Sequence, residues 1–269
     1  MSTAPFQVGS NPEAMYVDLA CTDSAQYGTF SAVAQDLIRT LRLSQGPIRD
    51  SVINALARWR AFWSVATVGL SQAEALGLFG ELWFLHRWLP AIGSEAVNRW
   101  QVTDAARHDF QWSAASVEVK TAATQTTGAP CHKIVSLDQL ADPKRGELYL
   151  FSLHVCDDAM SMNTLHSIVN SVTSSLKAEF QAVADLNDKL AARGYSPADR
   201  NVAERPLRIL AERLYRLGPG FPRLTRQTFE PVGLPTGVVA VEYTIDLSAC
   251  KDWLVAESPT DASASALVQ

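Results

Sequence analysis

The sequence lacks any apolar run approaching the roughly 18 residues of a membrane span. Its first residues, "MSTAPFQVGSNPEA", also lack the basic and apolar regions of a signal peptide. No GxxxxGK[ST] motif is present, so any nucleotide-driven motor would be another protein. We therefore expect a cytoplasmic protein that makes no membrane contact.

Cysteine is scarce, and its spacing excludes two classes of protein. The chain has four cysteines, Cys21, Cys131, Cys156 and Cys250, which lie far apart and form no CxxC pair. Neither a zinc site nor a disulfide framework is indicated by this spacing. We expect four free thiols.

Positive charge is also in short supply. The net charge is −5, which argues against a protein that coats nucleic acid through its overall field. The segment 193–226 is an exception, with eight arginines and three acidic residues. A solvated helix face is one interpretation. A phosphate-binding stripe is the other, with Arg205, Arg208, Arg213 and Arg216 as candidate contacts.

Hydrophobic spacing divides the chain into a helical part and a sheet. After a strand over 15–21, helical periodicity predicts helices over 29–43, 48–65 and 72–89, the last with Ser71 and Glu74 spaced as a capping box. Short runs rich in β-branched and aromatic residues then predict strands over 97–103, 107–113, 116–121, 132–137 and 147–155. Further helices are expected over 163–193 and roughly 203–217, and a strand over 237–247.

The stretch "RHDFQWSAASVEVKT" places charges in two of these strands. If the strands form a hairpin that turns at Ala114 and Ala115, Asp109 faces Lys120, and the two faces separate polar from apolar side chains. One face then carries Asp109, Gln111, Glu118 and Lys120, and the other carries Phe110, Trp112, Val117 and Val119. A bulge of one residue would change this arrangement.

The polar face has the parts of a metal-assisted hydrolytic site. Asp109 and Glu118 would lie diagonally, about 7–8 Å apart at the backbone, so both carboxylates could reach one cation. Hard oxygen ligands suit Mg²⁺, and an ammonium at Lys120 could act on water or phosphate. The competing interpretation is a solvated sheet face with a salt bridge, since the pattern is short and "DPK" at 142–144 matches it too.

The predicted helix over 72–89 contains one carboxylate, Glu81, among apolar residues. Gly77 and Gly80 each cost this helix about 1 kcal/mol relative to Ala, so they indicate close approach of another backbone. Glu81 would then point towards the packed element. The alternative is that it reaches an exposed edge or pairs with a residue such as Arg87.

The segments "GLFGELWFL", "HDF", "VEVKT" and "SLDQL" together resemble a bacterial family of PD-(D/E)XK motif proteins, within the superfamily of restriction-type nucleases. "GPGFPRL" and "VEYTIDLSAC" extend the resemblance through most of the chain. It implies a mixed α/β fold, with an αβββαβ core, a mixed central sheet flanked by helices and a helical N-terminal extension. We expect residues 1–70 to pack on a nuclease-like domain over 71–250, followed by a disordered tail over 251–269.

The resemblance also implies roles for single residues. Glu81, Asp109 and Glu118 match the metal-binding positions, and Lys120 matches the lysine that acts on the attacking water. Mg²⁺ is the implied cofactor, with Mn²⁺ as a substitute. His108 stands where the motif has proline, a position that does not ligate metal, so it becomes a candidate substrate contact. Gln111 and His132 are further candidates of this kind.

The implied function is a Mg²⁺-dependent nuclease that cuts DNA in a bacterial restriction or phage-defence system. Its implied partners are a second copy, or a larger complex with a separately encoded ATPase or methyltransferase. One alternative is a non-cleaving nucleic-acid-binding or assembly subunit that keeps the fold. Another is an interaction protein whose hairpin charges are merely solvated.

Overall fold

The computed structural model describes residues 2–6, 14–18, 20, 27–43, 47–65, 69–103, 106–124, 129–176, 179–197 and 200–259. The chain divides into two compact units, residues 1–64 and 65–269. Cys21 and the end of the strand predicted over 15–21 lie outside the described residues, as do residues 260–269 of the predicted tail.

The first unit contains a β-hairpin and two helices. Strands β1 (Ser2–Phe6) and β2 (Ala14–Asp18) pair antiparallel. Helices α1 (Tyr27–Leu43) and α2 (Ile48–Val65) follow, close to their predicted ranges. Apolar residues spaced one turn apart on α1, Val33 and Leu37, are buried with Ala55 of α2, so the helical periodicity marks a real packing face.

The second unit begins with α3 (Gln72–Trp88), the internal helix of the fold. Its predicted capping box is present, because the Ser71 hydroxyl accepts from the Glu74 amide at 3.2 Å and the Glu74 carboxylate accepts from the Ser71 amide at 2.8 Å. Most residues of its later turns are buried, Phe79 and Phe84 among them, and only the side with Trp83, His86 and Arg87 is partly exposed. Such a helix must be covered on several sides.

A five-stranded mixed sheet covers α3. Its order is β3 (Phe110–Gln111), β4 (Ala115–Ala123), β6 (Glu147–Asp157), β7 (Leu207–Arg216) and β9 (Leu254–Ala256), with β4 and β6 parallel and the other neighbours antiparallel. Helix α5 (Leu165–Ser175) lies between β6 and β7 in the chain. The order α3–β3–β4–β6–α5–β7 is the αβββαβ core, so the predicted mixed α/β fold is confirmed.

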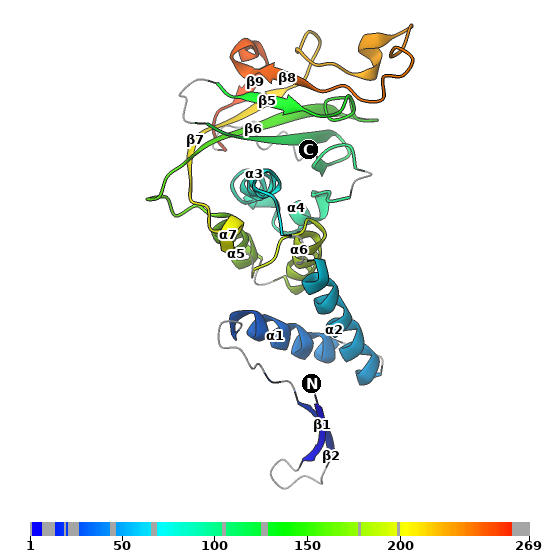
Figure 1. Cartoon of the computed structure of the whole chain (residues 1–269), viewed down its shortest axis with the longest axis vertical. Helices are drawn as coiled ribbons and strands as arrows, with labels where there is room; N and C mark the ends of the chain where they lie inside the picture. The colour runs from blue at the N-terminus through cyan, green and yellow to red at the C-terminus, as the bar shows by residue number, and fades with distance from the viewer. Residues whose placement is uncertain are drawn as a thin grey trace. The chain divides into compact units, whose positions relative to one another are not determined.

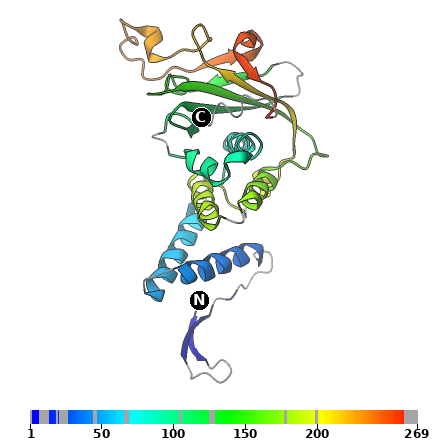
Figure 2. The same ribbon diagram turned by 180° about the vertical axis from the view of Figure 1, so that it is seen from behind.

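The sheet separates two layers, as Figures 1 and 2 show. Helices α3, α4 (Ser94–Arg99), α5, α6 (Phe180–Ala192) and α7 (Arg200–Ala203) lie on one side. The antiparallel pair of β5 (Cys131–Ile134) and β8 (Tyr243–Asp246) lies on the other side. Short 3₁₀ turns are found over Pro90–Ile92, Arg226–Phe229, Leu247–Ala249 and Lys251–Trp253.

Each layer has its own apolar core. The larger core packs α3 and α5 against one face of β6, including Phe84 and Phe151, whose ring centroids are 4.8 Å apart. The smaller core packs Leu150 and Tyr215 of the opposite face against Ile245 of β8. Nine consecutive residues of β6 are therefore buried, and full burial of each large side chain contributes about 1.5–3 kcal/mol.

Several predicted elements are wrong. The helix predicted over 203–217 is mostly strand β7, which pairs with β6 along its whole length. The first residues of the strand predicted over 97–103 are instead the end of α4, which the i,i+4 ion pair of Arg99 with Glu95 at 2.6 Å supports. Of the rest, Trp100 forms an isolated antiparallel bridge with Phe110. The long helix over 163–193 is two helices, α5 and α6. Strand β9 extends the sheet beyond residue 250, where the predicted tail begins.

The structure bears on the membrane-spanning segments and on the cysteines. In the part of the chain that is described, no helix combines the length and apolarity needed to cross a membrane. Cys131, Cys156 and Cys250 are free thiols, as their spacing predicts.

Helix α3 packs tightly against the sheet at Gly80. A methyl group at this position would overlap the hydroxyl oxygen of Thr121 and lie 3.2 Å from its Cβ. Thr121 belongs to β4, so the predicted close approach is found here. At Gly77 no atom lies within 4 Å of such a methyl group, and the same prediction is wrong for that residue. Gly80 thus sets the distance between Glu81 and β4.

The two glycines provide a matched pair of substitutions. Gly80→Ala should lower the free energy of unfolding by about 1–3 kcal/mol, because β-branched Thr121 has little freedom to turn away. Gly77→Ala should raise it by about 1 kcal/mol, because open space surrounds the site and Ala favours the helix. Urea denaturation of both variants measures the difference. Equal stabilities would show that Gly80 does not limit the approach of α3.

Candidate active site

The predicted hairpin is present, but its register differs by two residues. Phe110 lies opposite Val117, whereas the sequence predicts Val119 as its partner. A hydrogen bond from the Trp112 amide to the Ala115 carbonyl, 2.8 Å long, closes the turn one residue early. Because the difference is an even number, every strand residue keeps its predicted face.

The pairing of β3 with β4 ends at Val117, and among the described residues no strand continues this edge of β4 beyond it. There the Asp109 carboxylate takes the place of a strand partner, since its Oδ2 accepts a hydrogen bond of 2.7 Å from the Val119 amide. The Asp109 carbonyl accepts a second bond, 2.7 Å long, from the Gln101 amide. Both bonds fix the carboxylate at the sheet edge, next to Glu118.

Glu118 and Lys120 project from the same face of β4. Glu118 is only 4% exposed, and its Oε1 lies 2.8 Å from the Lys120 ammonium. Burial raises the pKa of Glu118 to about 8, and the Asp109 carboxylate contributes to this rise, while Lys120 opposes it. The predicted salt bridge therefore exists, but the interpretation of a solvated sheet face is wrong.

Glu81 brings a third carboxylate to this corner from α3. It is 4% exposed, its Oε2 accepts a hydrogen bond of 2.7 Å from the Trp100 indole, and its Oε1 pairs with Arg193. Burial and then Asp109 raise its pKa to about 8, whereas Arg193 and Trp100 lower it. The alternative pairing with Arg87 is wrong, because that guanidinium lies over the Trp83 ring.

Asp109 is the common neighbour of the other two carboxylates. Its own pKa is raised by burial, although the Val119 amide, Lys120 and Arg193 all lower it. The structure thus brings Glu81, Asp109, Glu118 and Lys120 within electrostatic reach of one another, from α3, the start of β3 and β4.

Trp100 and Arg193 are site residues that the sequence analysis missed. Trp100 is fully buried at the end of α4, and Arg193 follows α6, 112 residues after Glu81. Lys189, one turn before Arg193, donates to the carbonyl oxygens of Val97, at 2.6 Å, and Trp100. No local spacing links these residues, so only the packing of α6 against α4 reveals them.

The chemistry of the donor set fits a divalent cation. Across the described ranges, no three His, Cys, Asp or Glu side chains are grouped as a ready metal cluster. Mg²⁺, however, commonly takes only one or two protein carboxylates and completes its shell with water and phosphate. Asp109 and Glu118 supply two such carboxylates, and a cation between them would offset the repulsion that raises the pKa of Glu118.

His132 lies on the Lys120 side of the sheet. Its ring nitrogen Nε2 is 2.7 Å from the Ser152 hydroxyl, and Ser152 is the neighbour of Lys120 across β4 and β6. Burial and the Lys120 charge lower its pKa to about 3, so the ring is neutral. His132 therefore packs beside the lysine as a neutral group.

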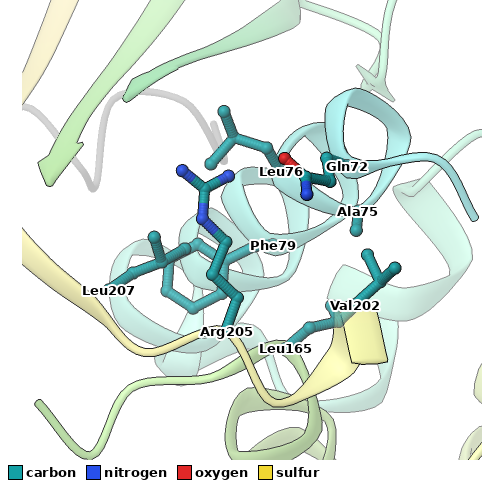
Figure 3. A pocket seen from close by; sticks show the side chains of 8 residues that line it. All are labelled: Gln72, Ala75, Leu76, Phe79, Leu165, Val202, Arg205 and Leu207. Carbon is teal, nitrogen blue, oxygen red and sulfur yellow. The ribbon is translucent and has the colours of Figure 1, made fainter. Parts of the chain in front are cut away.

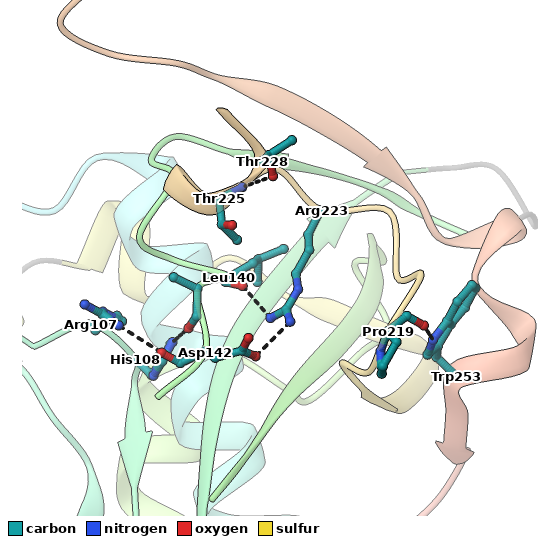
Figure 4. A network of polar contacts seen from close by, with 10 residues as sticks. Arg107, His108, Leu140, Asp142, Pro219, Arg223, Thr225, Thr228 and Trp253 are labelled. Carbon is teal, nitrogen blue, oxygen red and sulfur yellow. Dashed lines mark hydrogen bonds and ion pairs between the residues drawn. The ribbon is translucent and has the colours of Figure 1, made fainter. Parts of the chain in front are cut away.

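His108 is directed away from the carboxylates. Its Nε2 lies 3.0 Å from the Ala141 carbonyl, in a network where Arg107 and Arg223 both bind Asp142 (Figure 4). Burial lowers the pKa of His108 to about 4. This network fixes the loop after β5 to the start of β3. Gln111, in turn, donates to the His108 carbonyl at 3.4 Å.

The four candidate arginines do not form a stripe. Strand β7 places Arg213 next to Ser152 and Arg216 next to Tyr149, on opposite faces of the sheet. Each is paired with a carboxylate: Arg205 with Asp157 at 2.5 Å, Arg208 with Asp158 at 3.4 Å, Arg213 with Glu257 at 3.1 Å and Arg216 with Glu147. These partners come from other segments of the chain.

Arg205 also borders the small pocket of Figure 3. The pocket has a volume of about 10 Å³, and apolar side chains such as Phe79 and Leu207 line most of it. That volume is near the minimum for one water molecule. It is no substrate site.

Replacing Asp109 separates its charge from its hydrogen bond. A raised folded-state pKa means that the ionised form costs stability, and this cost grows as the pH rises above the unfolded value near 4. Asp109→Asn removes the charge but keeps an acceptor for the Val119 amide. We expect its melting temperature, in EDTA, to exceed the wild-type value at neutral pH, with a gain that shrinks towards pH 4.

Asp109→Ala is the matched control, because it also removes the acceptor. It should lower stability by about 1–3 kcal/mol, the usual cost of a buried donor left without a partner. Thermal melts of the three proteins across the pH range provide the measurement. If Asp109→Asn loses as much stability as Asp109→Ala, the Asp109 charge stabilises the fold.

Comparison with known proteins gives one match. No curated protein and no solved structure matches the chain. The model of the family described as "Putative PD-(D/E)XK family member, (DUF4420)" matches residues 6–248, a range that includes Glu81, Asp109, Glu118 and Lys120. The resemblance stated from the sequence is confirmed, and the chain belongs to this PD-(D/E)XK family.

Proposed function

We propose that the protein is a Mg²⁺-dependent nuclease that hydrolyses phosphodiester bonds of DNA, with Mn²⁺ as a substitute metal. One observation carries the proposal: Asp109 and Glu118 meet at the open edge of β4, with the Lys120 ammonium 2.8 Å from Glu118. Membership of the PD-(D/E)XK family supports the nuclease class. A bacterial restriction or phage-defence system is the setting we propose.

Asp109 and Glu118 would hold the metal, and Glu81 would support it or its water. When bound, the metal polarises the phosphate and lowers the pKa of water. The protein keeps the two ligands in place before substrate arrives, because the Val119 amide holds Asp109 and Lys120 holds Glu118. Such preorganisation removes the cost of ordering them during the reaction.

Lys120 would act on the reacting atoms. In the hydrolysis, a water oxygen bonds to phosphorus and the ester P–O bond breaks. The attacking water loses one proton, and the leaving oxygen takes up one proton. Negative charge builds on the phosphate oxygens during this step. The ammonium, with a side chain only 17% exposed, would stabilise that charge more strongly than in open water.

The chain must contact DNA locally, since its net charge is −5 and the surface arginines of β7 are paired. Cutting both strands of a duplex takes two active sites. We therefore propose that the protein acts as a homodimer, or in a complex with a separately encoded ATPase or methyltransferase.

A plasmid assay tests this function. The wild-type protein should nick or linearise supercoiled DNA with Mg²⁺ or Mn²⁺, and EDTA should abolish cleavage. Lys120→Ala should lower the rate by about 10²–10³-fold, as expected for loss of one charge-stabilising donor. Lys133→Ala is the matched control. Lys133 lies on β5 and forms an exposed ion pair with Glu242, so this variant should cleave at the wild-type rate.

Two outcomes would contradict the proposal. Equal products from wild type and Lys120→Ala would assign the cleavage to a contaminant. Binding of the plasmid without cleavage under either metal would instead support the non-cleaving subunit.

A further inference from the structure

The end of α6 forms a rigid corner beside the carboxylates. Gly194, with φ of +80°, ends the helix, and the Tyr195 amide returns to the Leu190 carbonyl at 2.9 Å. Lys189 ties the last turn to the carbonyls of Val97 and Trp100. Arg193 therefore leaves α6 from a fixed position, directly after the helix.

The ion pair of Arg193 and Glu81 is asymmetric. The Glu81 side chain is 5% exposed, whereas that of Arg193 is 32% exposed, so the carboxylate is buried and the guanidinium reaches solvent. A guanidinium has five N–H donors, and the Arg193 side chain uses Nη2 to bind Glu81. Within the described residues, the structure shows no other hydrogen bond from this guanidinium. Donors thus remain for a ligand.

The charge of Arg193 acts on more than its partner. It lowers the pKa of Asp109 and of exposed Glu74 as well as that of Glu81. The ion pair with Glu81 places the guanidinium beside the proposed metal ligands. The arginines of β7 differ from it, because Arg213 and Arg216 pair with exposed carboxylates of Glu257 and Glu147. Arg193 alone among these three pairs with a buried carboxylate of the site.

We propose that Arg193 binds a nonbridging oxygen of the DNA phosphate at the catalytic corner, through the guanidinium donors that Glu81 leaves free. This inference rests on the proposed nuclease function. Glu81 would orient the planar guanidinium, and the exposed edge would meet the phosphate with the geometry that arginine commonly uses. Arg193 then accounts for local DNA contact on a protein of net negative charge.

The test isolates the guanidinium without leaving a buried charge unpaired. Glu81→Gln keeps Arg193 and removes the ion pair, and Glu81→Gln/Arg193→Gln then removes only the guanidinium. Fluorescence anisotropy with a labelled DNA duplex in Mg²⁺, over a series of KCl concentrations, gives the slope of log K against log salt. If Arg193 makes one phosphate contact, the magnitude of this negative slope should be smaller by about 0.9 in the double variant than in Glu81→Gln. Arg99→Gln in the same background is the control, because Arg99 forms a surface ion pair with Glu95 and should leave the slope unchanged.

Cleavage by otherwise wild-type chains gives a second readout. Arg193→Lys, which keeps the charge, should retain more activity than Arg193→Gln, with circular dichroism confirming that both are folded. If the wild type cuts DNA but the slopes of the two Glu81→Gln proteins are equal, the role of Arg193 is overturned and the nuclease function stands. If the wild type binds DNA without cutting it, the nuclease function is overturned. A reduced slope would then still support a phosphate contact of Arg193. Absence of any DNA binding would overturn both.

Discussion

The negative charge of Asp109 is the interaction on which the site depends. After burial, it is the largest cause that raises the pKa of both Glu118 on β4 and Glu81 on α3. Three desolvated carboxylates oppose folding, and Lys120 and Arg193 offset this only in part. The two large apolar cores around β6 supply the stability that permits such a corner. A cation and a phosphate would complete the charge balance.

Local patterns predicted the parts of the site that lie within one element. The capping box at Ser71 fixed the start of α3, and strand alternation placed Glu118 and Lys120 on one face. That prediction survived a wrong register, because a difference of two residues leaves the faces unchanged. The fold followed from the order of elements and from the resemblance to a known family, not from the exact ends of the strands.

Contacts between segments that are distant in the chain could not be predicted from local sequence patterns. Arg193 reaches Glu81 from the end of α6, which Lys189 links to α4, and nothing in either local sequence indicates this contact. The segment 207–216 is rich in Leu, Arg, Ala and Glu, which favour a helix, yet pairing with β6 overrides that propensity. The arginines of this strand pair with carboxylates at the start of β6, just after β6 and after β9, so neighbouring residues do not indicate these pairs.

We propose that Asp109 and Glu118 hold one divalent cation at the open edge of β4. The most direct test is a crystal structure of the protein soaked in Mn²⁺, with anomalous scattering to locate the metal. We expect a peak about 2.1 Å from a carboxylate oxygen of each residue. A structure in which these carboxylates keep their present partners, while Mn²⁺ binds elsewhere or not at all, would contradict it.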